Sequence, residues 1–221
     1  MKIGWFYFGF FLMALFVLAG GAQAQNATFD NVSPGGSVDI SAGVYSLNGA
    51  AGEYNVTYNG TEYAGWCVDI EHYITPGGQY WGTLVPLSSS NLPVSPSGLY
   101  QAAYLAVTYD VGSLTDAQAA GLQGAIWEAV WTSTITGLSN WSPSSAQGYY
   151  TTDSSLGPYP AGFTGGGWEI LELFNNSTYT DPAQDLMIHV GVPEPGTLML
   201  LGFGLLGFVV LGRKFKKQIP A

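Results

Sequence analysis

The sequence predicts an α+β fold class, in which a β-rich, sandwich- or barrel-like domain carries a small helical subdomain. Several stretches alternate apolar and polar residues as half-buried strands do, and two central stretches repeat apolar residues at helical spacing. A long apolar run also stands near each end of the chain. These two runs predict an N-terminal signal peptide and a C-terminal transmembrane helix, both outside the domain.

The first 24 residues have the pattern of a secretory signal peptide. Lys2 precedes an apolar run, which ends in the small-residue pattern Ala22-Gln23-Ala24. Signal peptides that are cleaved during export typically combine a positively charged residue near the N-terminus, an apolar stretch and an A-x-A site. We therefore expect residues 1–24 to be removed and residues 25–192 to form the exported domain.

The stretch "EYNVTYNGTEYAGW" predicts a β-hairpin. Apolar and polar residues alternate on both sides of Asn59-Gly60, a dipeptide that favours a type I′ turn. The only cysteine of the chain, Cys67, follows directly. We expect it at the end of the second hairpin strand or just beyond it.

The remaining elements follow from the same two periodicities. Further strands are predicted at "SVDISAGVYSL", "GGWEILELF" and "DLMIHV". Helices are predicted from Ser97 to Tyr109 and from Thr115 to Trp131, where Thr115 or Asp116 can cap the second helix. The stretches "SSSNLPVSPSG" and "SSLGPYPAGFTGGGW" read as loops because they are rich in Ser, Pro and Gly.

The C-terminal apolar run predicts a membrane-spanning helix. It is uncharged from Thr197 to Gly212, slightly shorter than the roughly 20 residues that cross a bilayer as a helix. A basic tail follows the run and consists of Arg213, Lys214, Lys216 and Lys217. By the positive-inside rule this tail is cytoplasmic, and everything before the helix faces outward.

The order of features at residues 193–217 resembles the PEP-CTERM sorting signal of Gram-negative bacteria that make exopolysaccharide. It consists of Pro193-Glu194-Pro195, the apolar helix and the basic tail. The resemblance implies an exosortase as a partner that recognises and cuts near Pro-Glu-Pro. The helix would then hold the protein in the inner membrane only until it is processed to the cell surface or extracellular matrix. An ordinary membrane anchor with a proline-rich stalk stays open as the alternative.

The charge distribution excludes some classes of partner. All five basic residues lie outside residues 25–192, whereas Glu194 is the only one of the 15 acidic residues that does. Such a surface repels nucleic acid and anionic membranes, so we expect no nucleic-acid partner. One cysteine and two histidines do not make a structural zinc set, and no stretch has the spacing of a calcium loop. The sequence therefore predicts no metal centre and no cofactor.

One polar residue lies on the apolar side of the second predicted helix. Gln123 precedes Ile126 by three residues and Trp127 by four, so it lies on the same side or at its edge. The apolar stripe itself consists of Ala119, Leu122, Ile126, Ala129 and Val130. A buried side-chain amide costs roughly 1–3 kcal/mol unless its hydrogen bonds are made. In one interpretation Gln123 bonds neighbouring backbone and Cys67 is a small buried hydrophobe.

A second interpretation joins Cys67 to Gln123. A cysteine thiolate can attack a glutamine carboxamide, release ammonia and leave an internal thioester, provided that the two groups are forced together and water is kept out. The motifs "WCVD" and "LQGAIW" resemble those of the thioester domains of bacterial surface adhesins. The resemblance implies that Cys67 and Gln123 form the thioester, and that Ala125, Ile126 and Trp127 pack the helix. The best-known members have a longer stretch between the motifs, and many have Thr at the position of Leu122.

The function expected from this resemblance is covalent attachment in a biofilm or other extracellular matrix. The acceptor would carry an amine or a hydroxyl group, as exopolysaccharide, a surface protein or a polyamine does. Each thioester would react once, so the protein would be a reagent and not an enzyme. A non-covalent structural or carbohydrate-binding matrix protein with the same sorting signal stays open as the alternative.

A Cys–His hydrolase is a further alternative, in which His72 or His189 activates Cys67. His72 follows Cys67 by five residues, an odd offset that places the two side chains on opposite faces if the strand continues. His189 lies in the strand predicted just before the sorting signal. Neither position favours the hydrolase.

Overall fold

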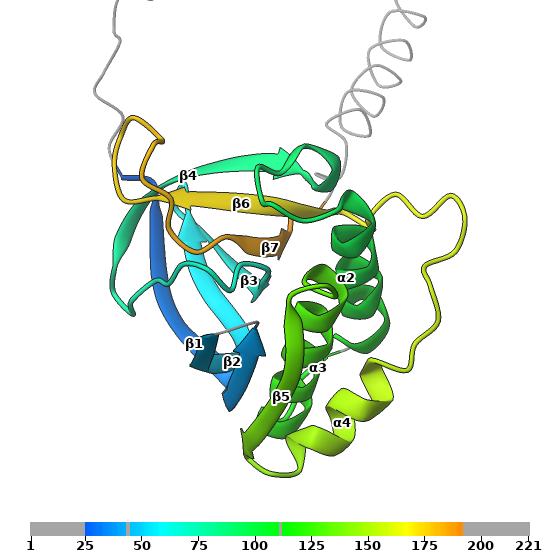
Figure 1. Ribbon diagram of the computed structural model, residues 1–221. Coiled ribbons are helices and arrows are strands. Elements are labelled where there is room, and N and C mark those ends of the chain that lie inside the picture. Colours follow the sequence, from blue (N-terminus) through cyan, green and yellow to red (C-terminus); the bar gives the residue numbers. More distant parts are fainter. Residues whose placement is uncertain (1–24, 43–44, 111, 192–221) are drawn as a thin grey trace, which may run out of the picture.

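The structure is a computed structural model that describes residues 25–42, 45–110 and 112–191 (Figure 1). These residues form an antiparallel, β-rich sheet with three α-helices. The predicted combination of a β-rich domain with helices is confirmed, although only two of the three helices were predicted. In chain order the elements are β1 (Ala27–Ala42), β2 (Tyr45–Tyr58), β3 (Thr61–Cys67), β4 (Gln79–Pro86), the 3-10 turn η1 (Leu87–Ser89), α2 (Pro96–Tyr109), α3 (Asp116–Val130), β5 (Ile135–Ser142), α4 (Ala146–Asp153), β6 (Trp168–Phe174) and β7 (Leu186–His189).

Six of the strands pair in a closed ring. The order is β1-β2-β3-β7-β6-β4, and β4 returns to β1, with every pairing antiparallel. The ring closes at Ala27, which pairs with Tyr58 of β2 and with Tyr80 of β4. The second half of β1, from Ser37 to Ala42, stays paired with β2 and also pairs with β5. Ring closure leaves β3 between β2 and β7, so the strand that carries the cysteine has a neighbour on both sides.

The predicted hairpin is confirmed as β2–β3. Asn59 and Gly60 have φ angles of 50° and 79°, the left-handed values that a type I′ turn requires at both central positions. The stretch "SVDISAGVYSL" was expected to be one strand, and this expectation is wrong. It holds the end of β1 and the start of β2, which pair with each other from Ala27–Tyr58 to Ala42–Tyr45.

The two predicted central helices are confirmed as α2 and α3. Ser95 accepts a hydrogen bond from the N–H of Gly98 at the start of α2, and Pro96 occupies its first turn. At the start of α3, Thr115 and Gln118 form a capping box, in which each side chain bonds the other residue's backbone. This local pair sets where α3 begins, and therefore where its later residues face.

Figure 1 shows most of the strands on one side and α2, α3 and α4 gathered on the other, with β5 running beside α3. α3 lies between the strands β1 and β2 and the helix α4. It is consequently buried on nearly every side, and not only along the predicted apolar stripe. The strands β4 and β5 and the helix α4 were not anticipated from the sequence.

Several predicted segments lie outside the described residues. They are the signal peptide at 1–24, the transmembrane helix at 197–212, the Pro193-Glu194-Pro195 motif and the basic tail. Among the helices of the described part, none is both long and apolar enough to cross a membrane.

Candidate functional site

Cys67 is the last residue of β3, as predicted, and its side chain is completely buried. Its backbone pairs with Leu186 of β7, and the N–H of the next residue, Val68, donates to the carbonyl of Asp185 at 3.2 Å. The antiparallel strand β7 and the residue before it therefore hold the chain at this point. The thiol faces the interior of the protein and forms no disulfide.

Gln123 meets Cys67 directly, and this contact accounts for the amide on the apolar side of α3. The Cys67 N–H donates to Gln123 Oε1 at 2.9 Å, and Gln123 Nε2 donates to the Cys67 carbonyl at 2.8 Å. The carboxamide thus bonds both backbone groups of one residue, as a neighbouring strand would. Gln123 has no solvent exposure, so this pairing offsets the cost of burying its amide. The structure brings together the two residues that the sequence analysis joined.

Three groups surround the sulfur of Cys67. Trp127 Nε1 donates to Sγ at 3.3 Å, and Gln184 Nε2 donates at 2.9 Å. The thiol in turn donates to the Asp69 carbonyl at 3.0 Å. Burial raises the pKa of the Cys67 thiol to about 12, although the hydrogen bond from Trp127 acts to lower it. The group is therefore a neutral thiol at rest, with two N–H donors already directed at its sulfur.

One face of α3 provides most of this arrangement. Gln123, Trp127 and Trp131 are spaced by four residues, so they lie one above another on the helix. Trp131, which caps the helix, donates its Nε1–H to the Val68 carbonyl at 2.8 Å. Gln123, Trp127 and Trp131 therefore bond two successive residues of the chain at Cys67 and Val68. The spacing of four residues is visible in the sequence, but only Gln123 could be identified from it, because it is the polar residue among the three.

The predicted packing residues Ala125, Ile126 and Trp127 are all buried. Trp127 does more than pack, since it also contacts the sulfur. The neighbouring Gly124 allows a close approach, because a Cβ placed there would stand 2.4 Å from the Trp141 ring on β5. Gly124 therefore lets β5 close over the outer side of the helix.

Gln184 was missed by the sequence analysis. Its Nε2 bonds both Cys67 Sγ and, at 3.1 Å, the Asp69 carbonyl. Gln184 lies just before β7, far from both motifs in sequence, and no local pattern marks it. Tyr54 is a further neighbour of the thiol, and the pKa of its phenol is raised well above 10.0 by burial and by the proximity of Cys67. Its hydroxyl donates to the Ala50 carbonyl at 3.0 Å.

Asp69 and His72 form a second pair beside the sulfur. His72 Nδ1 lies 2.7 Å from Asp69 Oδ2. The other oxygen, Oδ1, accepts hydrogen bonds from the backbone N–H groups of Glu71 at 2.8 Å and of His72 at 3.3 Å. The Asp69 side chain is 2% exposed and that of His72 is 37% exposed. The carboxylate is thus fixed in the interior while the imidazole reaches the surface.

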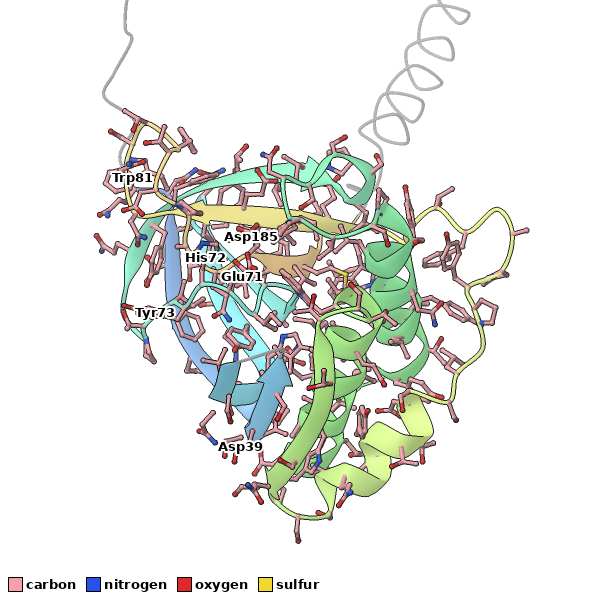
Figure 2. The ribbon with its side chains drawn as sticks, viewed as in Figure 1. Asp39, Glu71, His72, Tyr73, Trp81 and Asp185 are labelled. Carbon is pink, nitrogen blue, oxygen red and sulfur yellow. The ribbon has the colours of Figure 1, made fainter. Side chains whose placement is uncertain are left out.

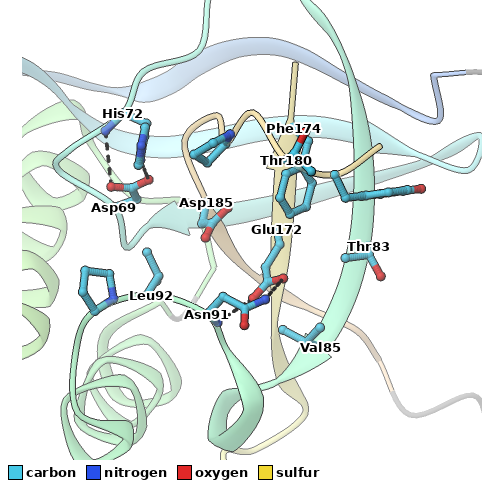
Figure 3. Close-up of a pocket in the computed structure, with 13 residues that line it drawn as sticks. Asp69, His72, Thr83, Val85, Asn91, Leu92, Glu172, Phe174, Thr180 and Asp185 are labelled. Carbon is cyan, nitrogen blue, oxygen red and sulfur yellow. Dashed lines mark hydrogen bonds and ion pairs between the residues drawn. The ribbon is translucent and has the colours of Figure 1, made fainter. Parts of the chain in front are cut away.

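Two cavities meet at this pair. One, of about 410 Å³, is lined by Asp69 and His72 together with Trp127, Gln184 and Tyr54, all of which are neighbours of the thiol. The other, of about 630 Å³, is also lined by Asp69 and His72 and is shown in Figure 3. The first cavity supplies a route between the surrounding solution and the residues that contact the sulfur.

The larger cavity is acidic. Glu172 accepts hydrogen bonds there from the backbone N–H of Asn91 at 2.7 Å and from its Nδ2 at 3.0 Å. Burial raises the pKa of the nearby Asp185 to about 8, although the N–H of Leu173 bonds its carboxylate and acts to lower it. Figure 2 shows Asp185 in the same part of the molecule as His72.

The histidines are not arranged as in a Cys–His pair. β3 ends at Cys67, so the premise that His72 lies on a continuing strand is wrong; the chain turns there, and the ring bonds Asp69. His189 Nε2 lies 3.1 Å from the Gly166 carbonyl. The hydrogen bonds to the sulfur come from Trp127 and Gln184. Within the described part of the chain, no group of three or more His, Cys, Asp or Glu side chains could hold a metal ion.

Comparison with known proteins bears on the C-terminal end. Residues 191–214 match the family described as the PEP-CTERM protein-sorting motif. The matched range contains Pro193-Glu194-Pro195, Arg213 and Lys214, but not the region of Cys67 and Gln123. No curated protein and no solved structure matches the chain. The sorting motif supports a PEP-CTERM protein, exported and processed at the membrane by an exosortase.

Proposed function

We propose that this exosortase-sorted protein forms an internal thioester between Cys67 and Gln123 and uses it to attach covalently to a nucleophile outside the cell. The observation that carries the proposal is the double hydrogen bond between the Gln123 carboxamide and the backbone of Cys67. It holds the electrophilic carbon of one side chain beside the residue that bears the nucleophile. Such positioning is the part of the reaction that a fold can supply in advance.

The chemistry of ring closure follows from the groups in place. Cys67 Sγ attacks the Gln123 Cδ, a C–S bond forms, the C–N bond breaks and the thiol proton leaves with ammonia. Negative charge develops on Gln123 Oε1 during the attack. The Cys67 N–H already donates to this oxygen at 2.9 Å, in the manner of an oxyanion hole.

The high pKa of the thiol makes this closure slow but does not prevent it. Only the thiolate is strongly nucleophilic, and burial keeps its population small. The N–H groups of Trp127 and Gln184 stabilise the negative charge as it forms on sulfur. The reaction has to occur only once in each molecule, so a slow rate is sufficient. The cavity of about 410 Å³, which both residues line, gives the ammonia a way out.

The same burial protects the product. Cys67 and Gln123 have no solvent exposure, so the thioester would be shielded from hydrolysis until a nucleophile enters the cavity. Attack on the Gln123 carbonyl would then release the Cys67 thiol and leave an amide or an ester. Residues 25–192 contain no lysine, so no lysine amine in this part of another copy can attack the thioester.

The test is the intact mass of the exported full-length chain beside Cys67→Ala and Gln123→Ala, before and after methylamine. We expect only the wild type to be lighter by one ammonia than its composition requires, and then to gain one methylamine. A wild-type mass equal to that of the plain chain, with a thiol that titrates freely after denaturation, would contradict the thioester. That result would favour a non-covalent structural or carbohydrate-binding matrix protein.

A protease that cuts after glutamate then locates the bond. Cuts at Glu62, Glu71 and Glu128 place Cys67 in residues 63–71 and Gln123 in residues 72–128. The thioester should link these two peptides before treatment. After treatment, methylamine should be found on residues 72–128 and the free thiol on residues 63–71. Methylamine on any other peptide would show that a different group had reacted.

A further inference from the structure

The imidazole of His72 is held in one orientation by the carboxylate of Asp69. A carboxylate oxygen accepts hydrogen bonds, so at 2.7 Å the ring donates from Nδ1 to Asp69 Oδ2. In the neutral ring this leaves Nε2 as the nitrogen with a free electron pair. The two backbone N–H groups that bond Asp69 Oδ1 fix the carboxylate in turn. Figure 3 shows the pair, with the ring above the carboxylate.

This pair is connected to the Cys67 sulfur through Asp69. The backbone carbonyl of Asp69 accepts hydrogen bonds from Cys67 Sγ at 3.0 Å and from Gln184 Nε2 at 3.1 Å. Its side chain meanwhile holds His72. His72 also lines the cavity of about 410 Å³ that is lined by Trp127 and Gln184, both of which donate to the sulfur. A nucleophile in this cavity can therefore contact His72 and the two residues that donate to the Cys67 sulfur.

We propose that His72 is the general base for an amine that attacks the thioester, and that Asp69 positions it. This inference rests on the function proposed above. The amine nitrogen bonds to the Gln123 carbonyl carbon, the C–S bond breaks, and the proton of the amine passes to His72 Nε2. The proton is then delivered to the departing sulfur. The products are an amide on Gln123 and the Cys67 thiol, with His72 returned to its starting state.

Two features of the site favour this proton route. The Cys67 thiol has a pKa raised to about 12 by burial, so its thiolate is a poor leaving group unless a proton reaches it. The carboxylates of Glu172 and Asp69 line the neighbouring cavity of about 630 Å³, which also reaches His72. An acidic entrance attracts an ammonium ion, which releases one proton to the solvent before the free amine attacks. The substrate class is therefore a primary amine rather than a sugar hydroxyl.

The test measures the rate at which methylamine is taken up by chains that already contain the thioester. In His72→Asn the side-chain N–H can replace Nδ1–H towards Asp69, but the basic nitrogen is lost. We expect this variant to retain the ammonia deficit and to take up methylamine about 100-fold more slowly. Added imidazole should restore part of the rate. His189→Asn is the matched control, because His189 bonds the Gly166 carbonyl away from the cavity; it should react at the wild-type rate.

The outcomes separate this inference from the function on which it rests. A wild-type chain without the ammonia deficit would overturn both. The ammonia deficit can also be present while His72→Asn and a second variant, His72→Gln, both react at the wild-type rate. That result would overturn only the role of His72. A variant that reacts slowly and is not rescued by imidazole would point to altered packing and would also overturn that role.

Discussion

Replacing Gln123 with methionine tests the contact on which the proposed site depends. Methionine is similar to glutamine in length and volume, so the change removes the two hydrogen bonds to Cys67 without opening a large cavity. The measurement is best made in a Cys67→Ala background. There no thioester can form, and the Gln123 carboxamide stays intact in the reference protein.

The expected loss follows from the two backbone groups that are left without a partner. Residue 67 lies in the interior, where the wild-type side chain is completely buried, so water cannot replace the lost bonds. Each unsatisfied buried group costs about 1–3 kcal/mol, and the pair therefore about 2–6 kcal/mol. The methionine variant no longer has to bury a polar carboxamide, and this gain offsets part of the loss in free energy. We therefore expect a loss in the lower half of the range.

The assay is urea unfolding followed by tryptophan fluorescence, with the free energy of unfolding compared between the two proteins. Gln147→Met is the matched control, because Gln147 is exposed on α4 and the same change should cost less than about 0.5 kcal/mol there. If Gln123→Met also cost less than about 0.5 kcal/mol, the Gln123 amide would not be paired with the backbone at position 67. The proposed thioester would then have no geometric basis.

Two further predictions concern stability in the same background. Burial raises the folded-state pKa of Asp185 from 3.8 to about 8. The contribution of the protonated Asp185 side chain to stability is therefore complete below pH 3.8 and is lost as the pH rises through 8. Asp185→Asn keeps an oxygen acceptor but cannot ionise. Between pH 5 and pH 9 the free energy of unfolding should therefore fall less in this variant than in the reference protein, and the two falls should differ by an amount on the order of several kcal/mol. Equal pH profiles for the two proteins would contradict this prediction. Gly124→Ala would place a Cβ 2.4 Å from the Trp141 ring and should cost about 1–3 kcal/mol in urea unfolding. Gly137→Ala on β5, where the added Cβ would have no atom within 4 Å, should be close to neutral. Equal effects of the two glycine substitutions would show that β5 does not pack on α3 as described.

Much of the local structure was predictable because it depends on neighbouring residues. The hairpin follows from Asn59-Gly60, whose two residues tolerate the positive φ angles of the turn. The start of α3 follows from Thr115 and Gln118, which satisfy each other's backbone groups. Gln123 was identified because a polar side chain among apolar ones has to find a partner.

The wrong and missed predictions have one physical cause. The stretch "SVDISAGVYSL" alternates like one strand, yet it holds the end of β1 and the start of β2, which pair with each other. The strands β4 and β5 are held by partners far along the chain, in β6 and β1. Periodicity shows that a segment can bury one face, but it does not show which segment covers that face.

The sequence by itself determined the two motifs at Cys67 and Gln123, the hairpin, the two central helices and the sorting motif at residues 191–214. Each of these is encoded within a short stretch of chain. Only the tertiary structure decided that Gln184 contacts the sulfur and that Asp69 holds His72 beside the same cavity. The pairing of β7 with β3 brings Gln184 to a cysteine 117 residues away. Such contacts depend on how strands pair across the whole fold, and no local pattern of residues records them.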